Sequence, residues 1–81
     1  MNCPIPGYKF APFGCWYGLQ VAVDEKVSLF YSAPLDGVPR PVFVTKSFKN
    51  GKLRVTSGEV TFTADPSHLD RFYWLEKEAM P

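Results

Sequence analysis

The chain is poor in the side chains that small metal centres and redox sites need. It has one histidine and two cysteines among its 81 residues. The spacing of Cys3 and Cys15 fits no zinc pattern, and His68 alone leaves too few ligands for a closed tetrahedral site without scattered carboxylates. We therefore expect no metal and no cofactor. In a reducing compartment, we expect both cysteines to be free thiols.

Long apolar runs are also missing. No stretch approaches the roughly 18 to 20 apolar residues of a membrane-spanning helix, which argues against a membrane partner. The N-terminus lacks a basic segment followed by an apolar one, the pattern of a secretory signal. These two absences predict a cytoplasmic protein.

Groupings of residues that would indicate catalysis are absent as well. Gly7, Gly14 and Gly18 are too dispersed to form a phosphate-binding loop. No third residue is placed to orient a cysteine–histidine pair, and no two carboxylates obviously converge on a cleft. We therefore expect a protein that is not an enzyme.

The segment from Pro41 to Phe62 alternates apolar and polar residues, which predicts a three-stranded meander. Two-residue turns at Asn50-Gly51 and Ser57-Gly58 would pair Lys46 with Val55 and Val55 with Val60. A shift of the strand pairing by one residue would expose the apolar side chains to water, so the sequence strongly specifies which side chains lie on each face. The expected inner face carries Val42, Val44, Phe48, Leu53, Val55, Val60 and Phe62.

An upstream hairpin is predicted by the same alternation in residues 15–23 and 27–32. A loop of Asp24, Glu25 and Lys26 would pair Val23 with Val27. Such loops favour glycine at their left-handed position, where Lys26 is a poor occupant. The Pro- and Gly-rich residues 33–41 are expected to cross the surface between hairpin and meander.

The C-terminal residues 66–79 are predicted to form a helix, with Asp65 as its cap and Pro66 at its first position. Trp74 would then lie on the polar side, an unusual place for so large an apolar side chain. The resulting fold class is α+β: a small antiparallel sheet of about five strands, hairpin plus meander, with one C-terminal helix packed on one face. Residues 1–81 form a single domain with an extended arm (1–14), antiparallel strands (15–64) and the helix (66–79).

Charge is unevenly distributed although the net charge is only +1. Between Gly37 and Gly58 the chain carries five basic residues and no acid, namely Arg40, Lys46, Lys49, Lys52 and Arg54. A like-charge pair at Lys49 and Lys52 costs a few tenths of a kcal/mol or more in a hairpin. The basic hairpin is therefore a candidate surface for an acidic protein or for phosphates, and an ordinary solvated edge is the alternative.

Outward-facing aromatic residues favour a protein partner. Trp16 and Phe30 point away from the expected inner face of the first hairpin, and Trp74 points away from the sheet. Aromatic side chains in such settings often anchor interfaces. We predict a non-catalytic protein-binding module, such as a small stoichiometric regulator or inhibitor, or a self-associating chain. Its partner-binding residues would be Trp74, Trp16, Phe30, Lys49, Lys52 and Arg54.

Two alternatives remain open. The basic hairpin Lys46–Arg54 could make the chain a nucleic-acid-binding domain, although only Phe43 is available there as a stacking platform. A barrel-like sheet would favour that alternative, and a flat open sheet would not. The proline-rich arm could lie on its own domain, where it would cover Trp16 and Phe30, or dock onto another chain.

Overall fold

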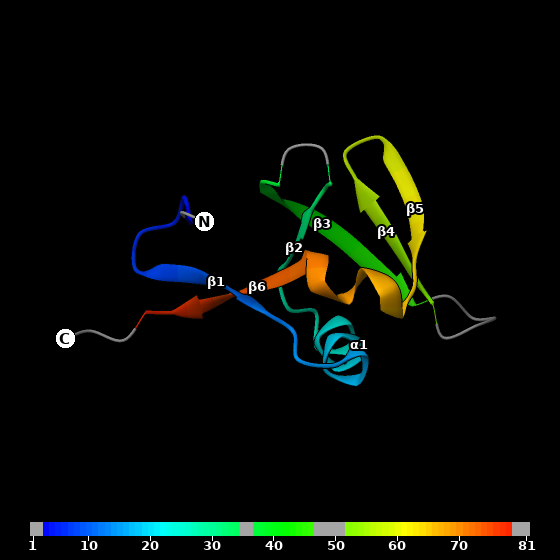
Figure 1. The fold of residues 1–81 in the computed structure, drawn as a ribbon, viewed down its shortest axis with the longest axis horizontal. Coiled ribbons are helices and arrows are strands. Elements are labelled where there is room, and N and C mark those ends of the chain that lie inside the picture. The colour runs from blue at the N-terminus through cyan, green and yellow to red at the C-terminus, as the bar shows by residue number, and fades with distance from the viewer. Residues whose placement is uncertain (1–2, 35–36, 47–51, 79–81) are drawn as a thin grey trace.

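Six antiparallel strands form one sheet in the computed structural model, which describes residues 3–34, 37–46 and 52–78 (Figure 1). The strands are β1 (Tyr8–Pro12), β2 (Leu29–Ser32), β3 (Pro39–Lys46), β4 (Leu53–Ser57), β5 (Val60–Ala64) and β6 (Phe72–Lys77). Helix α1 (Trp16–Asp24) precedes β2, and the 3-10 helix η1 (Pro66–Arg71) joins β5 to β6. The order across the sheet is β1-β6-β2-β3-β4-β5.

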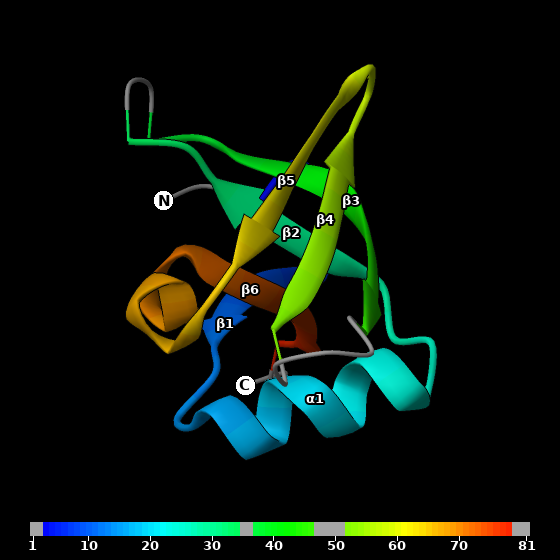
Figure 2. The ribbon, with the colours of Figure 1, turned by 90° about the vertical axis from the view of Figure 1, so that its right-hand side faces the viewer.

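The sheet curls around one apolar core. The ring of Tyr31 on β2 lies 5.0 Å from that of Phe62 on β5, although two strands separate β2 from β5 in the sheet order. Figure 2 shows α1 lying across one end of the curled sheet. The buried core comes from α1 and from both halves of the sheet: Leu19, Ala22, Leu29, Leu53, Val55, Ala64 and Phe72.

The prediction of a first strand over residues 15–23 is wrong, because this segment is helix α1. Leu19 and Ala22 are buried one helical turn apart, and Trp16 and Val23 pack beside them against the core. Tyr17, which the strand interpretation placed inside, is 74% exposed. The apolar residues of this segment fit both the two-residue period of a strand and the 3.6-residue period of a helix, so periodicity alone does not distinguish the two.

Helix α1 ends at Asp24, and its C-cap Glu25 is followed by a left-handed residue, Lys26, whose φ is +57°. The N–H of Lys26 donates to the carbonyl of Val23, and the N–H of Val27 donates to that of Ala22. This is the Schellman arrangement, in which the left-handed residue after the C-cap is most often glycine. Lys26 was predicted to be a poor occupant of the left-handed position in a hairpin loop. It does adopt a left-handed conformation, but after the end of a helix and not in a hairpin.

The predicted C-terminal helix over residues 66–79 is also wrong, because only Pro66–Arg71 is helical, as a 3-10 helix. Asp65 caps the segment and Pro66 begins it, as predicted, but η1 ends at Arg71 and strand β6 follows. In a strand, Phe72 and Trp74 share one face, and both contact the core. The run Phe72-Tyr73-Trp74 consists of aromatic residues that suit a strand better than a helix.

Strand β6 lies between β1 and β2 and pairs with both. Residues 1–14 were expected to form an extended arm, and within them Tyr8–Pro12 forms β1, an edge strand on the outer side of β6. The arm therefore lies on its own domain. The five-stranded sheet with a packed C-terminal helix is replaced by six antiparallel strands with α1 near the N-terminus.

The meander is present but in a different register. Its strands keep the predicted alternation of faces, although Val60, expected inside, is 63% exposed, and Phe48 lies outside the described residues. Val55 pairs with Val44 and with Phe62, where the sequence suggested Lys46 and Val60. Both ladders are shifted by two residues, which leaves the same side chains on each face. Gly58, at φ +61°, and Glu59 form the second turn, whereas Asn50-Gly51 lies outside the described residues.

Phe72 should be essential for stability because it is 0% exposed and joins β6 to the core. We expect Phe72→Ala to lower the free energy of unfolding by about 3 to 5 kcal/mol in urea denaturation, since it leaves a large cavity. Phe43 is 68% exposed, so Phe43→Ala should cost less than about 0.5 kcal/mol. Equal losses for the two variants would show that the core is placed wrongly.

Candidate functional site

The aromatic residues predicted to bind a partner are more buried than expected. Phe30 is only 9% exposed, and its ring meets that of Phe10 from β1 at 5.1 Å between centroids. Trp16 and Trp74 are half-buried and pack against the core. The N-terminal arm therefore covers Phe30, as expected if the arm lies on its own domain. None of these three side chains is an exposed anchor of the kind that the sequence suggested.

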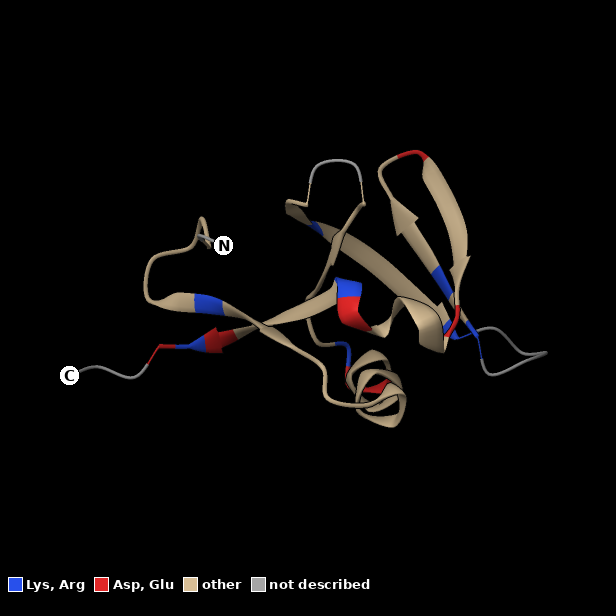
Figure 3. Cartoon of the chain, viewed as in Figure 1, with Lys and Arg blue, Asp and Glu red and all other residues tan. Residues whose placement is uncertain are grey.

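The basic residues are better placed for contact. Lys52 and Arg54 are exposed near the start of β4, close to the end of β3, and Figure 3 shows this clustering of basic residues. Arg54 pairs with Thr45 and Thr63, so it lies on the outer face of the meander. Lys49 lies outside the described residues.

The sheet carries a second apolar surface, which we call the outer aromatic face and define as Tyr8, Phe10, Phe30, Tyr73 and Leu75. Cross-strand partners share a face, and Phe10 pairs with Leu75 while Phe30 pairs with Tyr73. The rings of Phe10 and Tyr73 lie 6.2 Å apart. Pro41 and the exposed Phe43 continue this face along β3, since Pro41 pairs with Phe30.

Both helices cover the opposite face of the sheet. Leu19 and Ala22 of α1 belong to the buried core, and Leu69 of η1 packs against it. Within residues 3–34, 37–46 and 52–78, no helix therefore covers the outer aromatic face. Tyr8 at the edge of this face is 40% exposed. A half-exposed apolar surface of this kind is a common feature of protein interfaces.

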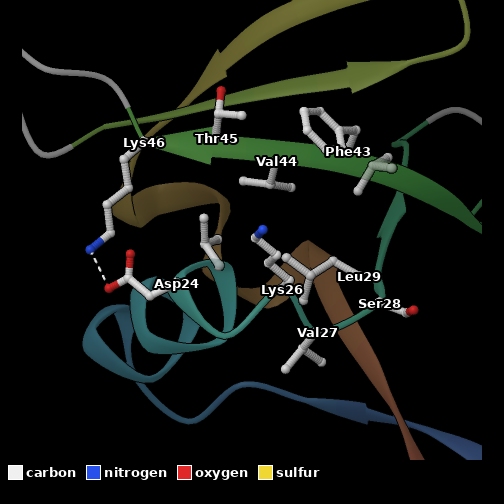
Figure 4. Close-up of a pocket in the computed structure, with 11 residues that line it drawn as sticks. Asp24, Lys26, Val27, Ser28, Leu29, Phe43, Val44, Thr45 and Lys46 are labelled. Carbon is white, nitrogen blue, oxygen red and sulfur yellow. Dashed lines mark hydrogen bonds and ion pairs between the residues drawn. The ribbon is translucent and has the colours of Figure 1, made fainter.

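A groove of about 630 Å³ opens between the end of α1 and strand β3 (Figure 4). We call it the α1–β3 groove. Its apolar walls come from both elements and from the start of β2, through Val23, Val27, Leu29, Val42 and Val44. Sequence analysis missed this groove, because it exists only where residues 16–24 are helical. The one signal was Lys26, a residue poorly suited to its position that lines the groove.

An ion pair bridges one end of the α1–β3 groove. The Lys46 ammonium lies 2.6 Å from the Asp24 carboxylate, and Figure 4 shows this contact joining α1 to β3. Both side chains are about half exposed, so the pair contributes about 1 kcal/mol at most. Because Asp24 is neutralised by Lys46, Lys26 is left as the unbalanced charge of the groove lining.

Strand β3 changes partner midway along the groove. Its pairing with β2 ends at Val42 opposite Leu29, and its pairing with β4 runs from Phe43 to Lys46. On the side of the departed β2, residues 43–46 therefore have no neighbouring strand among those described. The groove occupies the wedge that opens there, as Figure 4 shows.

Ser67, His68 and Asp65 form a cluster whose composition resembles a catalytic triad but whose geometry does not. The Ser67 hydroxyl and His68 Nδ1 both contact the same oxygen, Asp65 Oδ1. In a triad the serine hydroxyl contacts the histidine, which the carboxylate orients from its other nitrogen. The Ser67 N–H also donates to Asp65 at 2.9 Å, so the cluster caps η1.

Metal ligands and sequence relatives add no further assignment. In the described part of the chain no three His, Cys, Asp or Glu side chains gather around a common point, and no helix has the length and apolar character to cross a bilayer. Cys3 and Cys15 are not bonded to each other, and Cys15 Sγ accepts a hydrogen bond from Gly18 at the start of α1. No protein-family model matches the chain, and no curated protein or solved structure is significantly similar to it.

The Asp65 cap should make stability depend on pH. The hydrogen bond from the Ser67 hydroxyl, followed by that from the Ser67 N–H, lowers the pKa of Asp65 from its ordinary value. A carboxyl whose pKa is lower in the folded state stabilises the fold above its unfolded pKa, about 3.9, and loses this effect as pH falls through the folded pKa. We therefore expect the Tm difference between wild type and Asp65→Asn to shrink on going from pH 6 to below pH 3.

Asp65→Asn is the matched variant because an asparagine keeps a capping oxygen but does not titrate. Asp65→Ala removes the cap as well and should have the lowest Tm of the three at pH 6. A wild type and an Asp65→Asn variant whose Tm values run parallel over the whole pH range would contradict the pKa shift.

Proposed function

We propose that the chain is a non-catalytic protein-binding module that docks a folded partner protein through the outer aromatic face. The observation that supports this function is that β1, β6 and β2 carry apolar side chains on both faces, while both helices cover only one face of the sheet. Antiparallel sheets that stand alone usually alternate an apolar inner face with a polar outer one. A second apolar face is costly in water unless another surface covers it.

The composition of the outer aromatic face suits a flat apolar surface on the partner. Phe10, Tyr73 and Phe30 support one another by ring contacts, so they would lose little conformational entropy on binding. Tyr8 and Lys77 pair at the edge, where they supply a hydroxyl and a charge for a polar rim. A stoichiometric regulator or inhibitor is a natural role for such a module, and self-association is the alternative that the oligomeric state distinguishes.

Nucleic-acid binding is the second candidate, and one observation favours it. The sheet is curled as in a small open barrel, and Lys52 and Arg54 are exposed beside it. Against it, Phe10 and Phe30 pack on each other and leave little ring surface for bases to stack on. The net charge of +1 also differs from the strongly basic domains that bind duplex.

A double variant, Tyr8→Ser with Leu75→Gln, should weaken partner binding by about 30-fold, the size of an interface hot spot. Tyr17→Ser is the matched control, because Tyr17 is the most exposed tyrosine described and lies on α1. Binding would be measured with the partner recovered from native lysate, and light scattering would report the oligomeric state. Equal binding by wild type, double variant and control would exclude the outer aromatic face.

A random-sequence oligonucleotide should bind more weakly than about 1 μM at physiological salt, as measured by fluorescence anisotropy. Micromolar or tighter affinity would favour nucleic-acid binding if the logarithm of the binding constant fell linearly with the logarithm of the salt concentration. The expected slope is about −0.9 for each phosphate neutralised on duplex. In that case, charge reversal by Lys52→Glu with Arg54→Glu should abolish binding. An acidic protein partner would show a shallower salt response and no affinity for oligonucleotides.

A further inference from the structure

We propose that the α1–β3 groove is a second binding site, which takes an extended peptide strand that pairs with β3 at Val44 and places an acidic side chain beside Lys26. The site lies apart from the outer aromatic face and goes beyond the function proposed above. Strand addition of this kind uses main-chain hydrogen bonds for affinity and side-chain pockets for specificity.

Two prolines fix which backbone groups of β3 face the groove. In an antiparallel ladder, alternate pairs exchange both N–H···O bonds, and a proline cannot take part in such a pair. Pro39 and Pro41 pair with β2, so the bonded pairs must be Arg40 with Tyr31 and Val42 with Leu29. The N–H and C=O groups of even-numbered residues therefore point to the β2 side, and those of odd-numbered residues to the β4 side.

This alternation directs the N–H and C=O of Val44 into the groove, where β2 has already turned away. No backbone hydrogen bond outside the strand ladders involves Val44 among the described residues. The ladder with β4 is unaffected, because its bonded pairs are formed by Phe43 and Thr45. Val44 thus offers one donor and one acceptor to an incoming strand, with Val42 and Leu29 forming the closed corner of the wedge.

The size and lining of the groove suit a short peptide. The open stretch of β3 from Phe43 to Lys46 spans about 13 Å at roughly 3.3 Å per residue. A volume of about 630 Å³ lies within the usual range of ligand pockets. The walls formed by Val23, Val27 and Val44 favour apolar side chains at alternate positions of the bound strand.

Lys26 determines the charge of the occupant. Its side chain extends into the space below Val44 in Figure 4, and no ion pair links it to a described residue. It also occupies a left-handed backbone position, at φ +57°, that glycine holds at lower cost. A second copy pairing edge to edge would bring a second Lys26 towards the first, so a strand with an acidic side chain complements the groove better.

The test is selection of linear peptides from a random seven-residue display library against the folded wild-type protein. We expect recovered peptides to lack proline, to alternate apolar residues and to carry Asp or Glu. Val44→Pro removes the N–H that faces the groove without removing a ladder bond, and it should weaken these peptides about tenfold or more relative to Val44→Ala. Val44→Ala is the matched control for the loss of side-chain packing.

Backbone N-methylation of the selected peptide tests the same pairing without changing the protein. Methylation of the one peptide N–H that pairs with Val44 should weaken binding about tenfold or more, and methylation at either neighbouring residue should leave it within about twofold, because successive N–H groups of a strand point to opposite sides. Lys26→Gly should raise the Tm by relieving the left-handed strain while weakening acidic peptides by up to about fivefold, the upper end for an ion pair with an exposed lysine.

Several results would overturn the inference. They are a library that yields no binder, binders that tolerate N-methylation at every position, and binders indifferent to Lys26→Gly. A dimer abolished by Val44→Pro would name a second copy as the occupant instead. Binders lost in the Tyr8→Ser, Leu75→Gln variant and retained by Val44→Pro would belong to the outer aromatic face, so the two sites fail independently.

Discussion

The burial of Phe72 within strand β6 is the constraint on which the rest of the fold depends. β6 is the only described strand that joins the N-terminal arm to the remainder of the sheet, because β1 pairs with it on one side and β2 on the other. Its inner face gives Phe72 and Trp74 to the core, and its outer face gives Tyr73 and Leu75 to the outer aromatic face. A helix over residues 72–77 would have contributed nothing to the outer aromatic face and would have left β1 and β2 without a strand to pair with.

Local sequence patterns predicted the alternating faces of the meander strands, but they did not predict helix α1 or strand β6. The alternation around Val44 and Val55 fixed the inner and outer faces, yet a shift of two residues preserves every face and is invisible to such a pattern. Residues 16–24 are apolar at both periods, and only their packing against the core makes them helical. The misfit of Trp74 on a helix was the one local sign that residues 72–77 form a strand.

The candidate sites were less accessible to sequence analysis than the fold. Trp16 and Phe30 were chosen as exposed anchors on the basis of a hairpin that does not exist, and α1 and β1 bury them partly or fully. The outer aromatic face is assembled from β1, β2 and β6, which are far apart in the chain, so no local pattern reveals it. The sequence marks Lys26 only as a poor occupant of a left-handed position. Lys26 and Val44 line the same groove because β2 diverges from β3 after Leu29 pairs with Val42.

The prolines of β3 have a consequence for aggregation. Among the described residues β3 has two unpaired stretches, one on each side: residues 43–46 beside the α1–β3 groove, and residues 39–42 beyond the end of β4. On the second stretch the groups pointing outward belong to Pro39 and Pro41, which have no N–H to donate. That stretch offers acceptors but no donors to a foreign strand, and proline at an edge is one of the devices by which natural sheets avoid joining edge to edge. Of these two stretches of β3, only residues 43–46 therefore present both a donor and an acceptor to another chain.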